Sequence, residues 1–251
     1  MGAVPKTLRE ALRPITVVAG HYGVGKTNFC VNLALDAAAA GVDVTLIDLD
    51  VVNPYFRASE QRALLEDAGV HLVAPVFAET GSSLDVPSLT GSIAPALERA
   101  RALAEDGAAS SDGLGALALV DAGGDDVGAR ALGRFARFIG GGDYALLYVL
   151  NRNRNLVADV DGALSILREI EAAARLSATA LVGNTHLKDE TSVGDIERGL
   201  DFARALERAT DLPLACVTAP RALLERFPAD RVLAADDLLY AIETPVRNPW
   251  E

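Results

Sequence analysis

The chain has 251 residues, a formal charge of -12 at pH 7 and a sequence pI near 4.7. Half of its residues are hydrophobic, which is enough for one large α/β core, and we interpret 1–251 as a single domain. The acidic balance argues against binding to a nucleic-acid backbone or an anionic membrane surface. No apolar run approaches the roughly 20 residues that span a bilayer, and two distant cysteines give no metal-ligand spacing, so a reduced, cytoplasmic chain is expected.

Apolar, β-branched runs predict the strands of the fold. They lie at 15–19, 42–47, 70–73, 116–120, 144–150, 178–182 and 214–218. Strands of this kind that alternate with amphipathic helices are typical of a parallel sheet covered on both faces. We therefore predict a three-layer α/β/α fold with a mostly parallel sheet of about seven or eight strands. Small and polar residues dominate 79–92 and 105–115, so we interpret 79–115 as a loop-rich excursion.

The first predicted strand leads into a glycine-rich motif that precedes a helical pattern. Its glycines let backbone N–H groups face phosphate oxygens, Lys26 can reach the β and γ phosphates, and the Thr27 hydroxyl can hold Mg²⁺. The chain is therefore predicted to bind a nucleoside triphosphate. The motif matches G-x-x-x-x-G-K-[ST], and with the residue after it the predicted contacts are Gly20, His21, Tyr22, Gly23, Val24, Gly25, Lys26, Thr27 and Asn28.

Two further predicted strands end on carboxylates. The run at 42–47 leads into Asp48 and Asp50, and the run at 116–120 leads into Asp121 and a Gly-Gly pair. Polar residues that follow the strands of a parallel sheet gather at one edge, where an aspartate beside a phosphate loop holds Mg²⁺ directly or through water. The Gly-Gly pair can bring an N–H close to a γ-phosphate and move when that phosphate leaves. The predicted metal ligands are Thr27, Asp48 and Asp121.

In this order, GHYGVGKT, DLD and a strand that ends in DAGGD resemble the deviant-Walker P-loop ATPases of the CobQ/CobB/MinD/ParA type, within the SIMIBI class. The resemblance runs from about residue 15 to residue 218. More closely, GHYGVGKT together with DLDVVNPYFR, DAGGDDVGARALGR and GNTHL resembles a bacterial group described as ATP-binding proteins. The resemblance implies a P-loop NTPase fold and a slow Mg²⁺-dependent ATPase that switches the binding of a protein partner.

Particular residues take roles from this resemblance. Lys26 matches the phosphate-contacting lysine, Asp50 matches the residue that positions or activates the attacking water, and Asp48 would act near the metal. Asp121 matches the Walker B acid, and Gly124 falls in the switch II loop. The resemblance therefore implies Lys26, Asp50 and Asp48 as the catalytic group.

The base is expected to be adenine. Asn184 matches the position whose side-chain amide reads the base, and Pro220 would pack near it. A guanine reader carries N-K-x-D, whereas the segment from Gly183 to His186 offers no acid after the asparagine. One amide can satisfy the donor and acceptor edge of adenine. ATP and Mg²⁺ are therefore the expected cofactors.

His21 and Tyr22 depart from the pattern of the family, which carries Lys-Gly there and uses that lysine across a nucleotide-sandwiched dimer. A neutral imidazole is a shorter and weaker phosphate donor than lysine. The sequence thus leaves a homodimer open without implying one. Two arginine groups also have two readings: Arg130 as a sensor or part of a solvated basic helix face, and Arg152 or Arg154 as contacts to base or phosphate or as structural residues.

Two other functions fit the same loop. A ligase or kinase of the dethiobiotin-synthetase or cobyrinic-acid amidase kind would activate a small carboxylate, with 79–92 as the candidate pocket. A non-hydrolysing ATP sensor would use binding alone. The two cysteines do not form the C-x-x-C pair of an Mrp-like iron–sulfur carrier, and the acidic stretch at 236–251 is unlike a cationic membrane helix. The expected partner is an unidentified protein, with no nucleic acid and no membrane.

Overall fold

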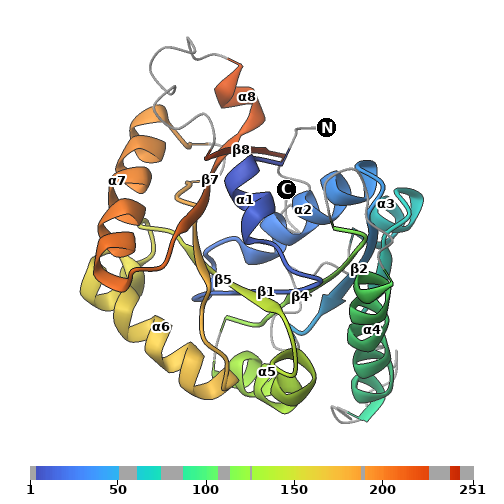
Figure 1. Cartoon of the computed structure of the whole chain (residues 1–251). Coiled ribbons are helices and arrows are strands. Elements are labelled where there is room, and N and C mark those ends of the chain that lie inside the picture. Colours follow the sequence, from blue (N-terminus) through green and yellow to red (C-terminus); the bar gives the residue numbers. More distant parts are fainter. Residues whose placement is uncertain are drawn as a thin grey trace, which may run out of the picture.

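The structure of the chain, a computed structural model, describes residues 4–50, 61–74, 87–106, 114–124, 126–187, 190–225 and 238–243. Within these ranges the strands form one sheet in the order β3-β2-β4-β1-β5-β6-β7-β8, and every neighbouring pair is parallel (Figure 1). This arrangement confirms the predicted fold class. The strands are β1 (Ile15–Ala19), β2 (Asp43–Asp48), β3 (His71–Val73), β4 (Ala116–Asp121), β5 (Tyr144–Leu150), β6 (Ala180–Gly183), β7 (Leu214–Pro220) and β8 (Leu239–Ile242).

Helices cover both faces of the sheet (Figure 1). On one face α2 packs on β1, β2 and β4, α1 packs on β7, and α3 lies beside α2. On the other face α4, α5, α6 and α7 follow one another across the sheet. The helices are α1 (Lys6–Ala11), α2 (Lys26–Ala39), α3 (Arg62–Asp67), α4 (Pro87–Glu105), α5 (Asp126–Ile139), α6 (Val160–Ala174), α7 (Val193–Thr210) and α8 (Arg221–Leu224), with a 3₁₀ turn at Asn155–Val157.

Burial on both faces explains the continuous apolar runs of the central strands. Every residue of β1 and β4 is buried, as are all but the first residues of β2 and β5. On α2 the side chains of Phe29 and Leu33 are fully buried, and the ring of Phe29 meets that of Tyr240 edge-on at 6.0 Å between centroids. Aliphatic and aromatic burial of this extent is the main stabilising term of the fold.

Two features differ from the sequence-based expectation. The loop predicted from residue 79 is wrong from Pro87 onward, because α4 begins there and buries Ile93, Leu97 and Ala100 at helical spacing. Residues 79–86 and 107–113 lie outside the described residues. Strand β8 extends the sheet beyond the seven predicted runs, and its short sequence LYAI carries a weak signal. The predicted strands are present with boundaries that differ by at most two residues.

Candidate nucleotide-binding site

The glycine-rich motif forms the turn between β1 and α2. Strand β1 ends at Ala19, and α2 begins at Lys26 with Gly25 as its N-cap residue at φ 90°. This left-handed backbone favours glycine, and a methyl group there would collide with the Asn184 side-chain nitrogen. The sequence therefore builds a loop whose backbone N–H groups open at a helix N-terminus, the arrangement that binds phosphate.

Lys26 lies against its own loop. Its side chain is 6% exposed, and Nζ donates a hydrogen bond to the His21 carbonyl oxygen at 3.2 Å. Tyr22, by contrast, exposes 54% of its surface. Burial lowers the pKa of His21 below 6.5, with a further lowering from Lys26. The ring of His21 is therefore neutral at pH 7, and Lys26 supplies the positive charge of the motif.

The site acids meet at the carboxyl ends of two adjacent strands. Asp48 of β2 and Asp121 of β4 are direct partners in the sheet register, so their side chains leave the sheet on the same side. The Asp50 backbone N–H donates to Asp48 Oδ1 at 3.0 Å, and the Leu49 N–H donates to the Asp121 carbonyl oxygen at 2.9 Å. All three acids are buried. The parallel register thus places Asp48 beside Asp121, and the backbone hydrogen bond to Asp48 holds Asp50 next to Asp48.

The pKa of Asp121 is strongly perturbed. Burial raises its pKa to about 7, and repulsion from Asp48 and then Asp50 acts in the same direction, while Lys26 and the Thr27 hydroxyl lower it. Neither of its carboxylate oxygens has a hydrogen-bond partner of regular geometry within the described residues. A buried carboxylate in this state is costly unless a cation or a donor meets it.

A magnesium ion fits this group of residues. Mg²⁺ prefers hard oxygen ligands and is held in such sites by one or two carboxylates, with waters and phosphate oxygens completing its shell. Asp121, Asp48 and the Thr27 hydroxyl offer the protein oxygens, and the carboxylate of Asp121 is buried near Thr27. The described residues contain no cluster of three or more His, Cys, Asp or Glu side chains suited to a metal, so water and phosphate would have to supply the remaining ligands.

The Gly-Gly loop after β4 lies directly on the phosphate loop. A methyl group on Gly124 would lie 2.6 Å from the Tyr22 backbone nitrogen and 2.7 Å from Lys26 Nζ. On Gly123 it would lie 2.9 Å from the Gly128 Cα in α5 and 3.4 Å from Asp50 Oδ1. Glycine is therefore required at both positions for this approach. The loop connects Lys26 with the start of α5.

Asn184 contacts the backbone of the phosphate loop. Its side-chain Nδ2 donates to the Val24 carbonyl oxygen at 2.6 Å, and its Oδ1 accepts from the Thr218 hydroxyl. The sequence assigned Asn184 to the base but did not identify Thr218, whose only signal was a polar residue near the end of an apolar strand. Pro220 lies at the end of β7, at the same edge of the sheet.

Asn28 ties α2 to the last strand. Its Nδ2 donates to the Glu243 carbonyl oxygen at 2.9 Å, and Asn32 Nδ2 donates to the same oxygen at 3.0 Å. Asn28 Oδ1 is buried and has no partner within the described part of the chain. The structure therefore places one end of this side chain in a structural contact.

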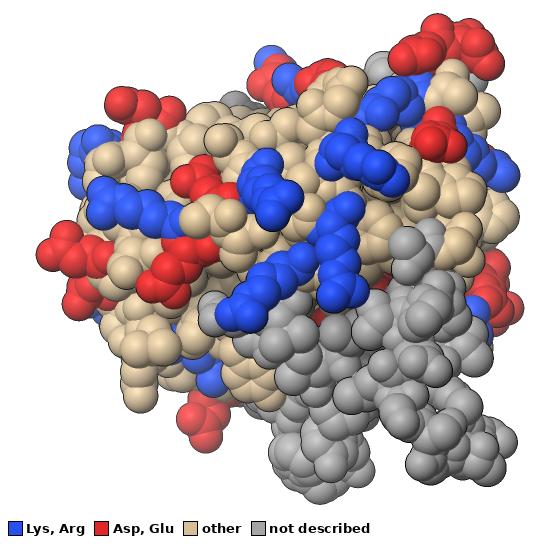
Figure 2. Space-filling view, turned by 90° about the horizontal axis from the view of Figure 1, so that it is seen from below, with Lys and Arg blue, Asp and Glu red and all other residues tan. Residues whose placement is uncertain are grey.

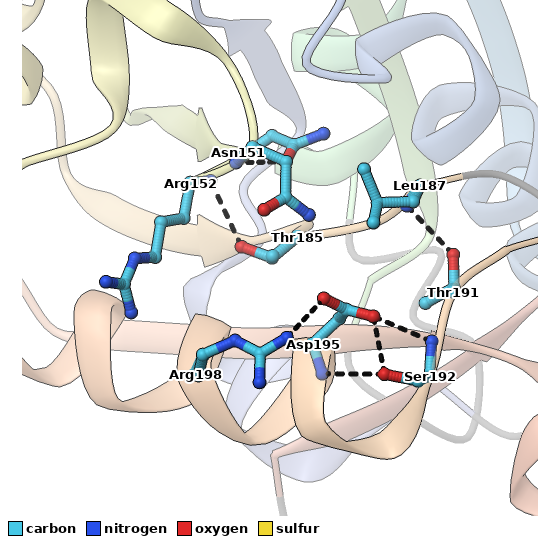
Figure 3. Close-up of polar contacts among 9 residues, drawn as sticks. Asn151, Arg152, Thr185, Leu187, Thr191, Ser192, Asp195 and Arg198 are labelled. Atoms are coloured by element: carbon cyan, nitrogen blue, oxygen red, sulfur yellow. Dashed lines mark hydrogen bonds and ion pairs between the residues drawn. The ribbon is translucent and has the colours of Figure 1, made fainter.

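The loops after β5 and β6 are linked to each other (Figure 3). Asn151 Nδ2 donates to the His186 carbonyl oxygen at 3.4 Å, and the Arg152 backbone N–H donates to the Thr185 hydroxyl at 3.2 Å. The side chain of Arg152 extends away from both residues and is exposed. Arg154, two residues further on, instead contacts the phosphate loop, with Nε donating to the Gly23 carbonyl oxygen at 2.8 Å.

The basic helix face that includes Arg130 lies on the exposed side of α5. Arg130, Arg134 and Arg137 are exposed, and the Arg137 guanidinium lies 4.5 Å from the centre of the Phe138 ring. Figure 2 shows the face of the molecule along which α5 runs, with Lys and Arg side chains gathered near its middle.

The two cysteines lie in the hydrophobic core. Cys30 and Cys216 are both free and buried. Burial raises the pKa of the Cys30 thiol, and the nearby carboxylate of Asp121 raises it further. Both thiols therefore stay protonated, as expected of small buried hydrophobic side chains.

Among the helices of the described residues, none is long and apolar enough to cross a bilayer.

Comparisons with known proteins concern the family and the fold of the chain. The sequence profile of the "CobQ/CobB/MinD/ParA nucleotide binding domain" matches residues 15–232. Among curated proteins no sequence matches the chain. Among solved structures, the signal recognition particle receptor FtsY of Elizabethkingia anophelis, in complex with GDP, has a TM-score of 0.50 at 21% identity, over 81% of this chain and 56% of that one.

Other FtsY structures give similar values. FtsY of Mycoplasma mycoides has a TM-score of 0.50 at 16% identity, over 81% of this chain and 59% of that one. The cell division protein FtsY of Thermotoga maritima has a TM-score of 0.50 at 20% identity, over 83% and 64%. This chain thus spans less than two thirds of each receptor, and the likeness concerns the fold. The family profile covers most of the chain, which therefore belongs to the CobQ/CobB/MinD/ParA nucleotide-binding domain family of P-loop NTPases.

Proposed function

We propose that this P-loop NTPase is a Mg²⁺-dependent ATPase that acts as a nucleotide-dependent switch for a protein partner. The observation that carries the proposal is the approach of Gly124 to the Tyr22 N–H and to Lys26 Nζ. Lys26 lies on its own loop and must turn to the phosphates when a nucleotide binds. A residue packed against both groups would then shift with the state of the phosphates. Through Gly123, that shift would reach Asp50 and Gly128 of α5.

The side chains of the site divide the work of hydrolysis. Mg²⁺, when bound, would neutralise negative charge on the phosphates. Asp121, Asp48 and Thr27 are suited to hold it, as their oxygens and burial indicate. Lys26 would contact the phosphates, and Asp50 would orient the attacking water. The Asp50 backbone N–H bond to Asp48 fixes the two acids relative to each other, which supports this division.

The edge that carries the site also offers a surface for a partner. In the described residues the exposed large hydrophobic side chains are Tyr22, Leu64, Leu156 and Leu187. Three of these four lie in the phosphate loop or in the segments that follow β5 and β6. Exposed apolar side chains around a functional site are typical of interaction surfaces. We propose that the partner docks at this edge, where nucleotide state can alter its contacts.

ATP is the proposed nucleotide. No acid follows Asn184 in the position that a guanine reader needs, since residue 187 is leucine. The Asn184 amide keeps one donor and one acceptor site beyond its bonds to Val24 and Thr218, which is enough for adenine.

Buried free cysteines also support a reducing compartment, and we propose the cytoplasm.

Two variants of the site test the ATPase proposal. Lys26→Ala is expected to lose both ATP binding and turnover, whereas Asp50→Ala is expected to keep binding and lose turnover. Lys6→Ala is the matched control, because Lys6 is exposed on α1. Calorimetry with ATP and GTP measures binding, and phosphate release measures turnover. Normal turnover in Asp50→Ala would remove its assigned role, and tighter binding of GTP would overturn the choice of base.

The switch proposal has its own test. Protein locked with ATP through Asp50→Ala, protein with ADP and nucleotide-free protein are compared as baits for partner capture. Only the ATP-locked bait is expected to capture the partner, and Tyr22→Ala in the same background should reduce the yield. If all three baits capture the same proteins, the switch proposal fails. Nucleotide release that depends on an added small carboxylate would instead favour a ligase or kinase.

A further inference from the structure

Arg154 is attached to the phosphate loop from a different part of the sheet. It follows β5 in an extended conformation, just before the 3₁₀ turn, and its backbone N–H donates to the Asn151 carbonyl oxygen at 3.1 Å. Its Nε donates to the Gly23 carbonyl oxygen at 2.8 Å. The backbone of one loop and a hydrogen bond to the other therefore fix the direction of the side chain.

The guanidinium lies over the Gly23 Cα. A methyl group on Gly23 would lie 3.2 Å from Arg154 Cζ and 3.5 Å from Nη2, so glycine leaves just enough room for the charged group. The ion pairs within the described residues join other side chains, and none includes Arg154. Its positive charge thus stands at the mouth of the phosphate loop without a carboxylate partner in that part of the chain.

The phosphate loop needs a second positive charge beside Lys26 to balance the charge of a bound triphosphate. A triphosphate brings several negative charges into a protein whose net charge is already -12, and Lys26 is the cation of the motif. His21 does not add a charge at pH 7, since burial, Lys26 and Arg154 lower its pKa below 6.5 against an opposite effect of Glu169. Arginine, unlike histidine, stays charged at every physiological pH and presents several donors in a fixed plane.

We propose that Arg154 is a phosphate-binding residue that supplies the second positive charge of the site from within the same chain. The proposal rests on the proposed function, because it requires a nucleotide in the loop. The bond from Nε to Gly23 orients the guanidinium, and the terminal nitrogens are then available to phosphate oxygens. The site is therefore electrostatically complete in one copy of the chain.

A purely structural role would use only the bond to Gly23, and two substitutions separate the two roles. Arg154→Gln keeps a side-chain N–H donor but no charge, and Arg154→Lys keeps the charge on a flexible stem. Arg152→Gln is the matched control, since Arg152 lies on the same loop with its side chain directed away from it.

The experiment measures the affinity of the full-length protein for Mg²⁺-ATP and Mg²⁺-ADP by calorimetry at several salt concentrations. Arg154→Gln is expected to bind both nucleotides about tenfold more weakly and with a shallower dependence on salt, because one screened attraction is gone. Arg154→Lys should stay within about threefold of the wild type and Arg152→Gln should be unchanged. Thermal unfolding without nucleotide reports whether each variant is folded.

Two results would overturn the proposal. One is wild-type affinity in Arg154→Gln. The other is an equal loss in Arg154→Gln and Arg154→Lys with an unchanged salt dependence, which would leave Arg154 as a structural support of Gly23. Failure of the proposed function looks different, because the wild type itself would then bind neither ATP nor GTP.

Discussion

Asp121→Asn should stabilise the nucleotide-free protein at pH 8 while it weakens Mg²⁺-dependent nucleotide binding. The Asp121 side chain is 1% exposed, and its pKa is raised from 3.8 to about 7 by burial and by the facing carboxylate of Asp48. The folded state therefore holds one more proton than the unfolded state between about pH 4 and pH 7. Stability from this group falls as the pH rises through that window, and the full cost of ionisation is present above it.

The size of the effect follows from the shift. Three pKa units at about 1.4 kcal/mol each give a ceiling of about 4 kcal/mol at pH 8. The asparagine amide keeps part of the desolvation penalty, so a gain of roughly 2–3 kcal/mol is expected. For a domain of this size that is a rise in Tm of roughly 5–10 °C.

Thermal unfolding followed by circular dichroism from pH 5 to pH 8.5 measures this gain. The difference in Tm between Asp121→Asn and the wild type should grow with pH and level off above pH 7. Asp201→Asn, an exposed substitution on α7, should show no such trend. A Tm for Asp121→Asn at or below that of the wild type at pH 8 would refute the reasoning, because the carboxylate would then not be held at a cost.

Gly124→Ala should reduce ATP affinity at least tenfold, because its new methyl group would lie 2.6 Å from the Tyr22 nitrogen; fluorescent-nucleotide titration measures this. Tyr240→Phe removes the 2.8 Å hydrogen bond from its hydroxyl to the buried Asp36 Oδ2 and should cost about 1–3 kcal/mol in urea denaturation. Asn184→Ala releases a carbonyl of the phosphate loop and removes the amide proposed to meet adenine, so calorimetry should show a larger loss of affinity for ATP than for GTP.

Each of these variants has a control. A methyl group on Gly91 meets nothing within 4 Å, so Gly91→Ala should leave ATP affinity unchanged. The Tyr144 hydroxyl exchanges hydrogen bonds with the backbone of the exposed Ser177. Tyr144→Phe should therefore lower the free energy of unfolding less than Tyr240→Phe does. An equal cost in both tyrosine variants would contradict the role given to the buried pair. An equal loss for ATP and GTP in Asn184→Ala would leave Asn184 with its contact to the phosphate loop and remove its proposed role at the base.

Much of this architecture follows from short-range patterns. Buried strands such as β1 and β4 can be predicted from the sequence, because both faces are covered and the apolar run is therefore unbroken. Helix α4 does not, since Pro95 lies inside it and its first turns contain Ser, Thr and Gly, which have low helix propensity. Packing of Ile93 and Leu97 against the sheet outweighs that local preference.

The candidate site also contains residues that the sequence predicts and contacts that it does not predict. Asp48 and Asp121 could be predicted, because each ends an apolar run and parallel strands place their carboxyl ends together. The contacts of Asn184 with Val24 and of Arg154 with Gly23 could not, since they join residues more than 130 positions apart in the sequence. Such contacts depend on which loops become neighbours in the folded chain, and local residue patterns do not predict that arrangement.

The acidic pair connects the stability of the protein with its function. Asp48 and Asp121 lie in register, are buried and repel each other, so the nucleotide-free fold carries an electrostatic cost at neutral pH. A dication with its nucleotide removes that repulsion in the folded state only, and ligands that bind only the folded state stabilise it. Mg²⁺-ATP should therefore raise the Tm of the wild type more than ATP with a chelator does. In Asp121→Asn the two increments should converge, because the repulsion that Mg²⁺ relieves is already absent.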